Sequence, residues 1–135
     1  MLSIQKQYEA YQQNAVTTAS SGQLTLMLYN GCIKFIKQAI IAVNEKDYES
    51  KNEHIQKAQN IVQELMLTLD QKIDISQQIM PLYEYANYQL IQGNVKNDVS
   101  ALEEALHIMT EFRDTWKEVI LRTGKNKLAE QGVKV

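Results

Sequence analysis

The sequence contains few of the residues that carry most metal, redox and linker chemistry. Its 135 residues include one cysteine, one proline, five glycines and two histidines. A single cysteine excludes an internal disulfide, and the scarcity of glycine and proline leaves no flexible linker between domains. We therefore predict a single domain over residues 1–135 in a reducing, cytoplasmic compartment.

Charge of one sign is also lacking. The formal net charge is -2, and Lys and Arg are scattered along the chain without forming a basic stripe. A binder of polyanions normally carries such a stripe, so we expect no nucleic-acid partner. The first residues of the chain have neither an apolar signal core nor a small-residue cleavage site, so the sequence predicts no secretion signal.

Residues 24–43 form the most apolar stretch and predict a long helix with two apolar sides. Asn30, Lys34, Lys37 and Gln38 would share one narrow polar strip. The first apolar side comprises Leu24, Leu28, Cys32, Phe35, Ala39 and Val43. The second side comprises Leu26, Tyr29, Ile33, Ile36 and Ile40. A bundle helix needs an apolar stripe of only about 100°, so something must cover the second side.

This stretch is long enough to be mistaken for a membrane span. Lys34 and Lys37 would then lie near the middle of the bilayer, where each costs roughly 2.5 to 3.5 kcal/mol on the insertion scale. We therefore expect no membrane insertion.

Four helical segments follow one another between short polar turns. Capping patterns start the first at Ser20, the second at Asp47, the third at Asp74 and the fourth at Ser100. The predicted ends lie near residues 44, 69, 93 and 124, and Pro81 predicts a kink in the third helix. The sequence thus predicts an all-α, antiparallel up-down four-helix bundle over residues 20–122. Residues 1–19 would form an N-terminal arm, and residues 123–135 a disordered tail.

Three further features are candidate contact sites, each with a structural alternative. Tyr8 and Tyr11, spaced by three in the arm, suit a reversible anchor, although an arm packed permanently on the bundle fits equally well. Tyr85 and Tyr88 point away from the apolar stripe of their helix, as functionless exposed tyrosines also do. Arg113 lies on the apolar side of the last helix, where it either rests its stem on apolar surface or awaits a carboxylate.

Helical bundles include carboxylate-bridged metal enzymes, so that class needs a test. Such sites use two Glu-x-x-His pairs and two further inward glutamates. This chain has one such pair, Glu104 and His107, on the polar face of its helix. No turn exposes a nucleophile and no glycine-rich loop would hold a phosphate. We predict no metal, no cofactor and no enzymatic activity.

A protein-binding module fits these patterns best. The excess apolar side of the first helix is then covered either by a partner chain or by a second copy of the same chain. Periodicity alone does not choose between these two covers.

Five segments together resemble one protein family. They are YEAYQQN from Tyr8, TASSGQLTLMLYNGCIKFIKQA from Thr18, KAQNIVQELMLTL from Lys57, NVKND from Asn94 and TEFRDTWKE from Thr110. As a set and in this order they are similar to the FliS family of flagellar export chaperones. Ser21 and Gln23 stand where the family usually has Pro and Glu, and both changes preserve a capping role.

The resemblance implies a cytoplasmic chaperone that binds the C-terminal segment of flagellin. Members of the family keep this segment from polymerising too early and deliver it to the export gate of the flagellar type III apparatus. The resemblance also implies that the N-terminal arm covers the bundle when no client is bound, and that other flagellar regulators are possible partners. The alternative is a self-associating bundle without a flagellin client.

We therefore predict a client surface on the second apolar side of the first helix. It comprises Leu26, Tyr29, Ile33, Ile36 and Ile40, with Tyr8 and Tyr11 of the arm as its reversible cover. Tyr85, Tyr88 and Arg113 are additional candidate contacts.

Overall fold

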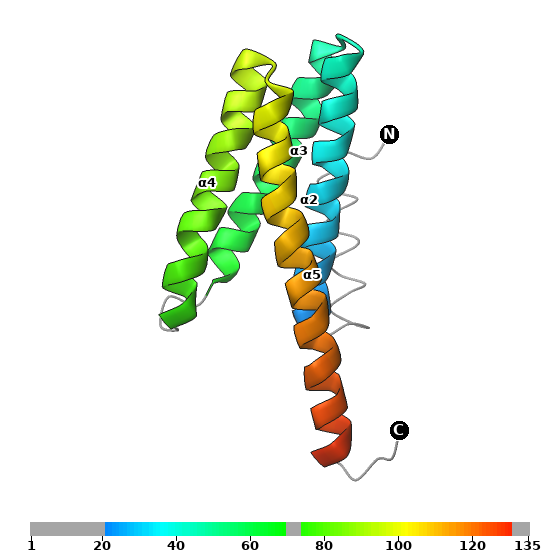
Figure 1. Ribbon diagram of the computed structural model, residues 1–135, viewed down its shortest axis with the longest axis vertical. Helices are drawn as coiled ribbons and strands as arrows, with labels where there is room; N and C mark the ends of the chain where they lie inside the picture. The colour runs from blue at the N-terminus through cyan, green and yellow to red at the C-terminus, as the bar shows by residue number, and fades with distance from the viewer. Residues whose placement is uncertain (1–20, 70–73, 131–135) are drawn as a thin grey trace.

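Four helices and the short turns between them make up the computed structural model. It describes the backbone of residues 21–69 and 74–130, and the side chains of residues 22–69 and 74–122. The helices are α2 (Ser21–Asn44), α3 (Tyr48–Thr68), α4 (Asp74–Lys96) and α5 (Val99–Glu130). They run alternately up and down (Figure 1), which confirms the predicted all-α antiparallel bundle. The predicted arm, with Tyr8, Tyr11 and the proposed cap Ser20, lies outside the described residues.

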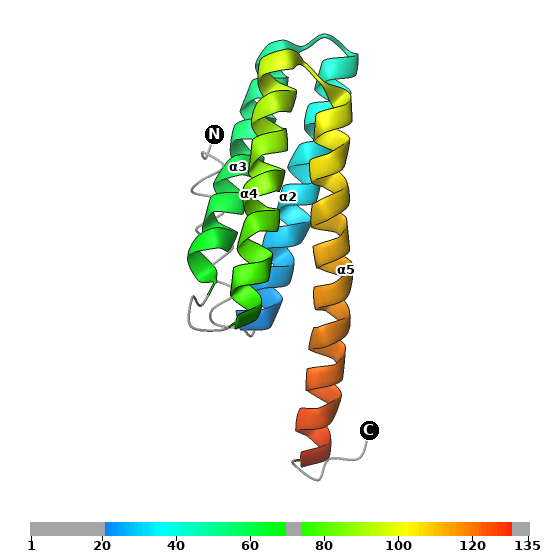
Figure 2. The same cartoon turned by 60° about the vertical axis from the view of Figure 1, so that its left-hand side comes forward.

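Each helix packs against two neighbours. α2 lies between α3 and α5, and α4 closes the bundle by contacting the same two helices (Figures 1 and 2). Of the described helices, α2 alone is long and apolar enough to cross a membrane by length and composition. Its central place in the bundle explains that composition, because a core helix buries apolar residues on more than one side.

The core is made by side chains from all four helices. Its largest fully buried members are Ile36, Ile55, Leu65, Leu90, Leu102, Met109, Val62 and Cys32. Burial raises the pKa of the Cys32 thiol to about 12, and its Sγ donates to the carbonyl oxygen of Ala58 at 3.7 Å. Cys32 is therefore a small core residue, as the sequence indicated, because a thiol with this pKa remains protonated.

The α2–α3 and α4–α5 turns lie at the same end of the bundle and share one construction. Lys46 and Asn97 adopt left-handed backbone angles, with φ of 59° and 52°. The next amide in each turn reaches back to the helix, from Asp47 to the carbonyl of Ala42 at 2.8 Å and from Asp98 to that of Gly93 at 3.1 Å. This is the Schellman arrangement, which satisfies carbonyls left free at a helix end.

Lys51 joins these two turns. Its ammonium, on a buried side chain, donates to the carbonyl oxygen of Asn94 at 2.8 Å and to Oδ1 of Asn97. A buried cation is tolerated only when its protons find acceptors, and this end of α4 supplies two. The start of α3 is thereby fixed to the end of α4.

Aspartates start the helices that follow these turns. The Asp47 carboxylate accepts from the amide of Ser50 at 3.2 Å, which confirms the predicted cap of α3. Asp98 plays the same part for α5, accepting from the amides of Ser100 and Ala101 at 3.0 and 3.4 Å. The predicted cap at Ser100 is therefore two residues too late, since the amide of Ser100 is itself bonded by Asp98.

Gly93 has a different role from the one predicted. We placed it at the end of α4 because glycine tolerates left-handed angles, but α4 continues to Lys96 and Gly93 is buried. A Cβ at this position would lie 2.4 Å from Cδ2 of Leu102. Glycine is needed here because α4 and α5 approach each other closely.

Pro81 lies inside α4, which starts seven residues earlier at Asp74. The helix therefore does not start just before the proline, which is the other arrangement that a proline in a helical pattern allows. Proline removes the donor that would bond the carbonyl of Gln77. Both residues are exposed, so water can satisfy that carbonyl.

The last helix is longer than expected. α5 continues to Glu130, so the predicted end near Gly124 is too early and residues 123–130 are helical, not a frayed tail. Its C-terminal end projects beyond the other three helices (Figures 1 and 2). The sequence pattern failed here because glycine ends a helix only when the backbone turns left-handed, and a lone glycine in a helix costs only about 1 kcal/mol.

The two candidate caps of α5 make a direct test. Asp98→Ala should lower the free energy of unfolding by about 1 kcal/mol, because two amides at the start of α5 lose their acceptor. Ser100→Ala, two residues later, should change the free energy of unfolding by less than about 0.5 kcal/mol. Urea unfolding followed by circular dichroism measures both. Equal losses in the two variants would contradict the assignment of the cap to Asp98 alone.

Candidate functional site

The predicted client surface on α2 lies mostly inside the bundle. Tyr29, Ile33 and Ile36 are at most 4% exposed, whereas Leu26 and Ile40 are half-buried. The expectation that this whole side lies open to a partner is therefore corrected. Side chains of the same chain cover its centre, and only its edge reaches the surface.

An aromatic cluster provides that cover. The ring of Tyr29 on α2 stacks on Phe112 of α5, with centroids 5.9 Å apart and planes 6° apart. Tyr83 of α4 also packs on Phe112, at a tilt and with ring centroids 5.1 Å apart. The two tyrosine hydroxyl oxygens lie 2.5 Å apart and share a hydrogen bond. Three helices thus meet at Tyr29, Tyr83 and Phe112.

The cluster is built to stay uncharged. Burial raises the pKa of both hydroxyls, and the hydrogen bond raises that of Tyr83 further while partly offsetting the rise at Tyr29. A buried hydroxyl without a partner would cost about 1–3 kcal/mol, so each tyrosine makes the other tolerable. This pairing assigns Tyr29 to the interior.

A half-buried row runs along the line where α2 meets α5. The indole Nε1 of Trp116 donates to the carbonyl of Gly22 at 2.8 Å, which with the stack of Tyr29 on Phe112 fixes an antiparallel register. In that register Leu26 lies at the level of Arg113. We call this row the α2–α5 seam; its members are Leu26, Ile40, Leu106, Arg113 and Ile120, all half-buried.

The register brings together two features that the sequence left apart. Leu26 and Ile40 follow one row of α2 at seven-residue steps with Ile33, and Arg113 follows the matching row of α5 with Leu106 and Ile120. The Arg113 side chain is 30% exposed, and its Nε donates to Oδ1 of the adjacent Asp114 at 3.1 Å. The carboxylate that pairs with Arg113 thus belongs to the same chain. The pair is exposed and contributes little to stability.

Tyr85 and Tyr88 lie on the outside of α4, and their exposed fractions of 44% and 54% confirm that they point away from the core. The Tyr85 hydroxyl donates to Oε2 of Glu104 on α5 at 2.8 Å. The amide of Gln89 donates to the Tyr85 hydroxyl at 2.7 Å and to the same carboxylate oxygen at 2.6 Å. Tyr85 therefore helps to link α4 and α5 at the surface.

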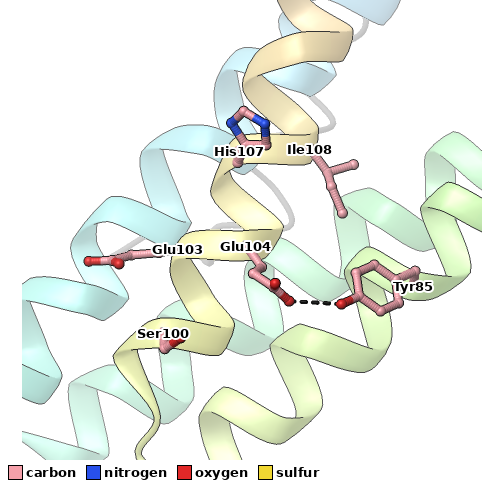
Figure 3. Close-up of a pocket in the computed structure, with 6 residues that line it drawn as sticks. All are labelled: Tyr85, Ser100, Glu103, Glu104, His107 and Ile108. Atoms are coloured by element: carbon pink, nitrogen blue, oxygen red, sulfur yellow. Dashed lines mark hydrogen bonds between the residues drawn. The ribbon is translucent and has the colours of Figure 1, made fainter.

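A shallow hollow of about 400 Å³ lies beside this link. Its lining residues are Tyr85, Ser100, Glu103, Glu104, His107 and Ile108 (Figure 3). In Figure 3 Tyr85 faces Glu104 across the hollow, whereas Glu103 points to the opposite side of α5. Of these lining residues, the sequence indicated only Tyr85 as a candidate contact. The pattern that would have indicated this region is the row Glu104, Glu111 and Glu118, at seven-residue steps on α5.

The lone Glu-x-x-His pair is engaged in other contacts. Glu104 bonds Tyr85 and Gln89, and Nε2 of His107 lies 3.1 Å from a carboxylate oxygen of Glu111. The other histidine, His54, stacks on Phe35 between α3 and α2. Within residues 21–69 and 74–122, no group of three or more His, Cys, Asp and Glu side chains is placed to hold a metal ion.

Comparison with known proteins adds the family context. Residues 4–123 match the family model described as flagellar protein FliS. The chain is 47% identical over 132 residues to the flagellar secretion chaperone FliS of Bacillus subtilis, covering 98% of this chain and 99% of that protein. It is 35% identical over 112 residues to the chaperone of the same name from Escherichia coli, covering 81% and 82%.

A solved structure supports the architecture independently. A crystal structure of a bacterial flagellar chaperone superposes with a TM-score of 0.71 over 89% of this chain and 99% of that one. The two sequences are 20% identical, so this likeness concerns the fold.

The difference between the centre and the edge of the α2 surface predicts different costs for the same charge. Ile36→Asp should lower the free energy of unfolding by about 4 kcal/mol or more, because a carboxylate would be buried without a partner. Leu26→Asp at the half-buried edge should cost about 1 kcal/mol. Urea unfolding of the two variants checks this ranking, and a folded, fully stable Ile36→Asp would contradict the interior assignment.

The paired tyrosines predict a loss of stability in alkali. Below pH 10.0, the ordinary tyrosine pKa, both hydroxyls are neutral in the folded and unfolded chain, so their full contribution is present. Above that pH the unfolded chain gains by ionising while the folded chain, whose pKa values are raised, does not. Each group should then lower the free energy of unfolding by up to about 1.4 kcal/mol per pH unit.

The control is the double variant Tyr29→Phe with Tyr83→Phe, which removes both hydroxyls together and keeps Cys32 and every other titrating group. Urea unfolding at pH 8 and pH 11 should show a smaller fall in the variant than in the native protein. Equal falls in both would show that the two hydroxyls ionise as freely in the fold as in the unfolded chain.

Proposed function

The chain belongs to the FliS family of flagellar secretion chaperones, and we propose from this that it binds the C-terminal segment of flagellin before export. In this proposal the chaperone keeps the segment from polymerising too early and delivers it to the flagellar type III export apparatus. It works in the cytoplasm as a single non-enzymatic domain without a cofactor. Client-loaded chaperone would meet the export gate, and other flagellar regulators are further possible partners.

The observation that carries the choice of surface is the α2–α5 seam. Apolar side chains from both helices lie half-buried along it. The other neighbour of α2 is α3 and that of α5 is α4, and both lie on the core side of the seam. An amphipathic helix can bury its apolar face on such a row, as helix-in-groove complexes do. Burial of about 25 cal/mol per Å² then has to exceed the several kcal/mol that ordering a disordered client costs.

Arg113 gives the seam one polar contact of defined direction. Its present partner is the adjacent Asp114, in an exposed pair that contributes roughly 0 to 1 kcal/mol. A carboxylate on the client would therefore replace Asp114 at little cost, while the arginine stem stays on the apolar row. We propose Leu26, Ile40 and Arg113 as client contacts, and Tyr29, Ile33 and Ile36 as the packed layer beneath them.

The arm remains part of the proposal. Tyr8 and Tyr11 lie outside the described residues, and their role as a reversible cover of the client surface is carried by the family resemblance alone. Removal of the arm should then strengthen client binding, because the cover competes with the client for the same row.

The structure weakens the argument for self-association. That alternative required a second copy to cover the second apolar side of α2, but α5 and the aromatic cluster of the same chain cover its centre. What is left at the edge is a narrow row, and no further observation favours a symmetric partner.

Calorimetric titration with the C-terminal segment of flagellin from the same cell tests the proposal. Native protein should bind one segment per chain, and Leu26→Asp should bind at least about tenfold more weakly, a loss of about 1.4 kcal/mol. Leu67→Asp is the matched control, because Leu67 on α3 is 81% exposed and away from the seam. It should change the dissociation constant by less than about twofold.

The outcomes separate the function from the site. If Leu26→Asp and Leu67→Asp both bind as tightly as the native protein, flagellin remains the client but the α2–α5 seam is not its binding site. No binding by the folded native protein would overturn the client assignment, and sedimentation of the free protein would then test for a dimer.

A further inference from the structure

An apolar surface on the other side of α5 is not used by the proposed client contacts. Ile75, Leu82 and Tyr85 of α4 are 59%, 47% and 44% exposed, and they succeed one another at seven- and three-residue steps. Across from them α5 contributes the half-buried Ile108 and the exposed Val119. Residues at these steps share one side of a helix, and Tyr85 of α4 lines the same hollow as Ile108 of α5. We call these apolar residues of the two helices the α4–α5 strip.

An acidic edge accompanies this strip. Glu104, Glu111 and Glu118 follow one another at seven-residue steps along α5. The Tyr85 hydroxyl contacts the first of them, which places this row on the α4 side of α5. No Lys or Arg occurs in α4 before Lys96 or in α5 before Arg113, so the edge is not neutralised from its own helices over residues 74–95 and 99–112.

The present partners of these glutamates are weak. Glu111 lies 3.1 Å from Nε2 of His107 and Glu118 lies 3.1 Å from Nη2 of Arg122, in pairs whose side chains are all at least 66% exposed. Exposed pairs of this kind are worth a few tenths of a kcal/mol on a helix. The carboxylates are therefore available to cations brought by another molecule.

The strip is separate from the α2–α5 seam. Glu104 and Leu106 are two residues apart on α5, which places their side chains on nearly opposite sides of the helix. Glu104 bonds Tyr85 of α4, whereas Trp116 bonds Gly22 of α2, so the strip and the seam lie along different neighbours of α5. One partner can occupy each without displacing the other.

Charge decides which occupant fits. A second copy of this chain related by a two-fold axis would meet the strip with the same strip, and would bring three more glutamates and no lysine or arginine from residues 74–95 and 99–112. An amphipathic helix with Lys or Arg at every seventh position beside an apolar face would instead match both the strip and its edge. The exposed Tyr88 ring next to Tyr85 adds a face on which a cation can rest.

We propose that the α4–α5 strip is a second docking surface, for a basic amphipathic helix of another protein. Its apolar floor is Ile75, Leu82, Tyr85 and Ile108, and its acidic edge is Glu104, Glu111 and Glu118. Attraction between the edge and the basic residues speeds encounter and sets the direction of the helix, whereas burial of the floor holds it. The proposal does not depend on flagellin being the client, because the two surfaces share no residue.

The probe is a synthetic helical peptide of roughly 18 residues with a leucine face and lysine at every seventh position. Its matched peptide carries glutamate in place of those lysines. Fluorescence anisotropy with the full chain should give a dissociation constant at least about tenfold lower for the lysine peptide, and added salt should narrow the difference.

Four variants locate the binding. Glu111→Lys on the edge and Leu82→Ser on the floor should each weaken the lysine peptide by about tenfold. Glu45→Lys makes the same charge change in the α2–α3 turn, and Leu67→Ser makes the same apolar change on α3; both should stay within about twofold of the native value. Circular dichroism of each variant shows that it is folded.

Four results would overturn the proposal. Equal loss in Glu45→Lys would show diffuse charge attraction, and equal loss in Leu67→Ser would show non-specific apolar binding. Equal affinity of the native protein for the lysine and glutamate peptides would contradict the proposal that the partner helix is basic. Sedimentation showing a native dimer that Leu82→Ser dissociates would replace the partner with a second copy of the chain.

Discussion

The structure depends on covering two sides of one helix. α2 carries the longest apolar stretch of the chain, and both Cys32, which faces α3, and Tyr29, which faces α5, are buried. A helix with a single apolar stripe needs one partner layer, but α2 needs neighbours on two sides. α3 supplies one and α5 the other, and α4 closes the ring between them. The antiparallel order follows because short turns join helices that must lie side by side.

This constraint also determines where a partner can bind. Once α5 is committed to covering α2, it presents one row of residues along α2 and another along α4, and both rows reach solvent at their outer edges. The row along α2 is apolar with a single arginine, whereas the row along α4 combines an apolar floor with an acidic edge. The two docking surfaces that we propose therefore differ in chemistry and lie along the same helix. The aromatic cluster beneath them, where Tyr29 and Tyr83 satisfy each other's hydroxyls, holds α2, α4 and α5 in register.

The helix ends show how far local patterns reach. Asp47 was recognisable as a cap because its carboxylate acts on an amide three residues away. Ser100 followed by Glu103 looked like the start of α5, but Asp98 takes that position, because a left-handed Asn97 ends α4 just before it. Gly93 looked like a helix end and is instead the place where Leu102 comes closest to α4. Ser100 and Gly93 each fit two roles in the local sequence. In both cases a residue of a neighbouring turn or helix, Asp98 or Leu102, determines which role is observed.

The sequence by itself determined the helical class, the four segments, the outward direction of Tyr85 and Tyr88, and the excess apolar surface of α2. These follow from periodicity and composition, which act within one helix at a time. Only the tertiary structure decided that Tyr29, Ile33 and Ile36 are interior while Leu26 and Ile40 lie at an edge, and that Arg113 lies level with Leu26. Those facts depend on the register and spacing of helices distant in sequence, which arise when side chains from all four helices pack into one core.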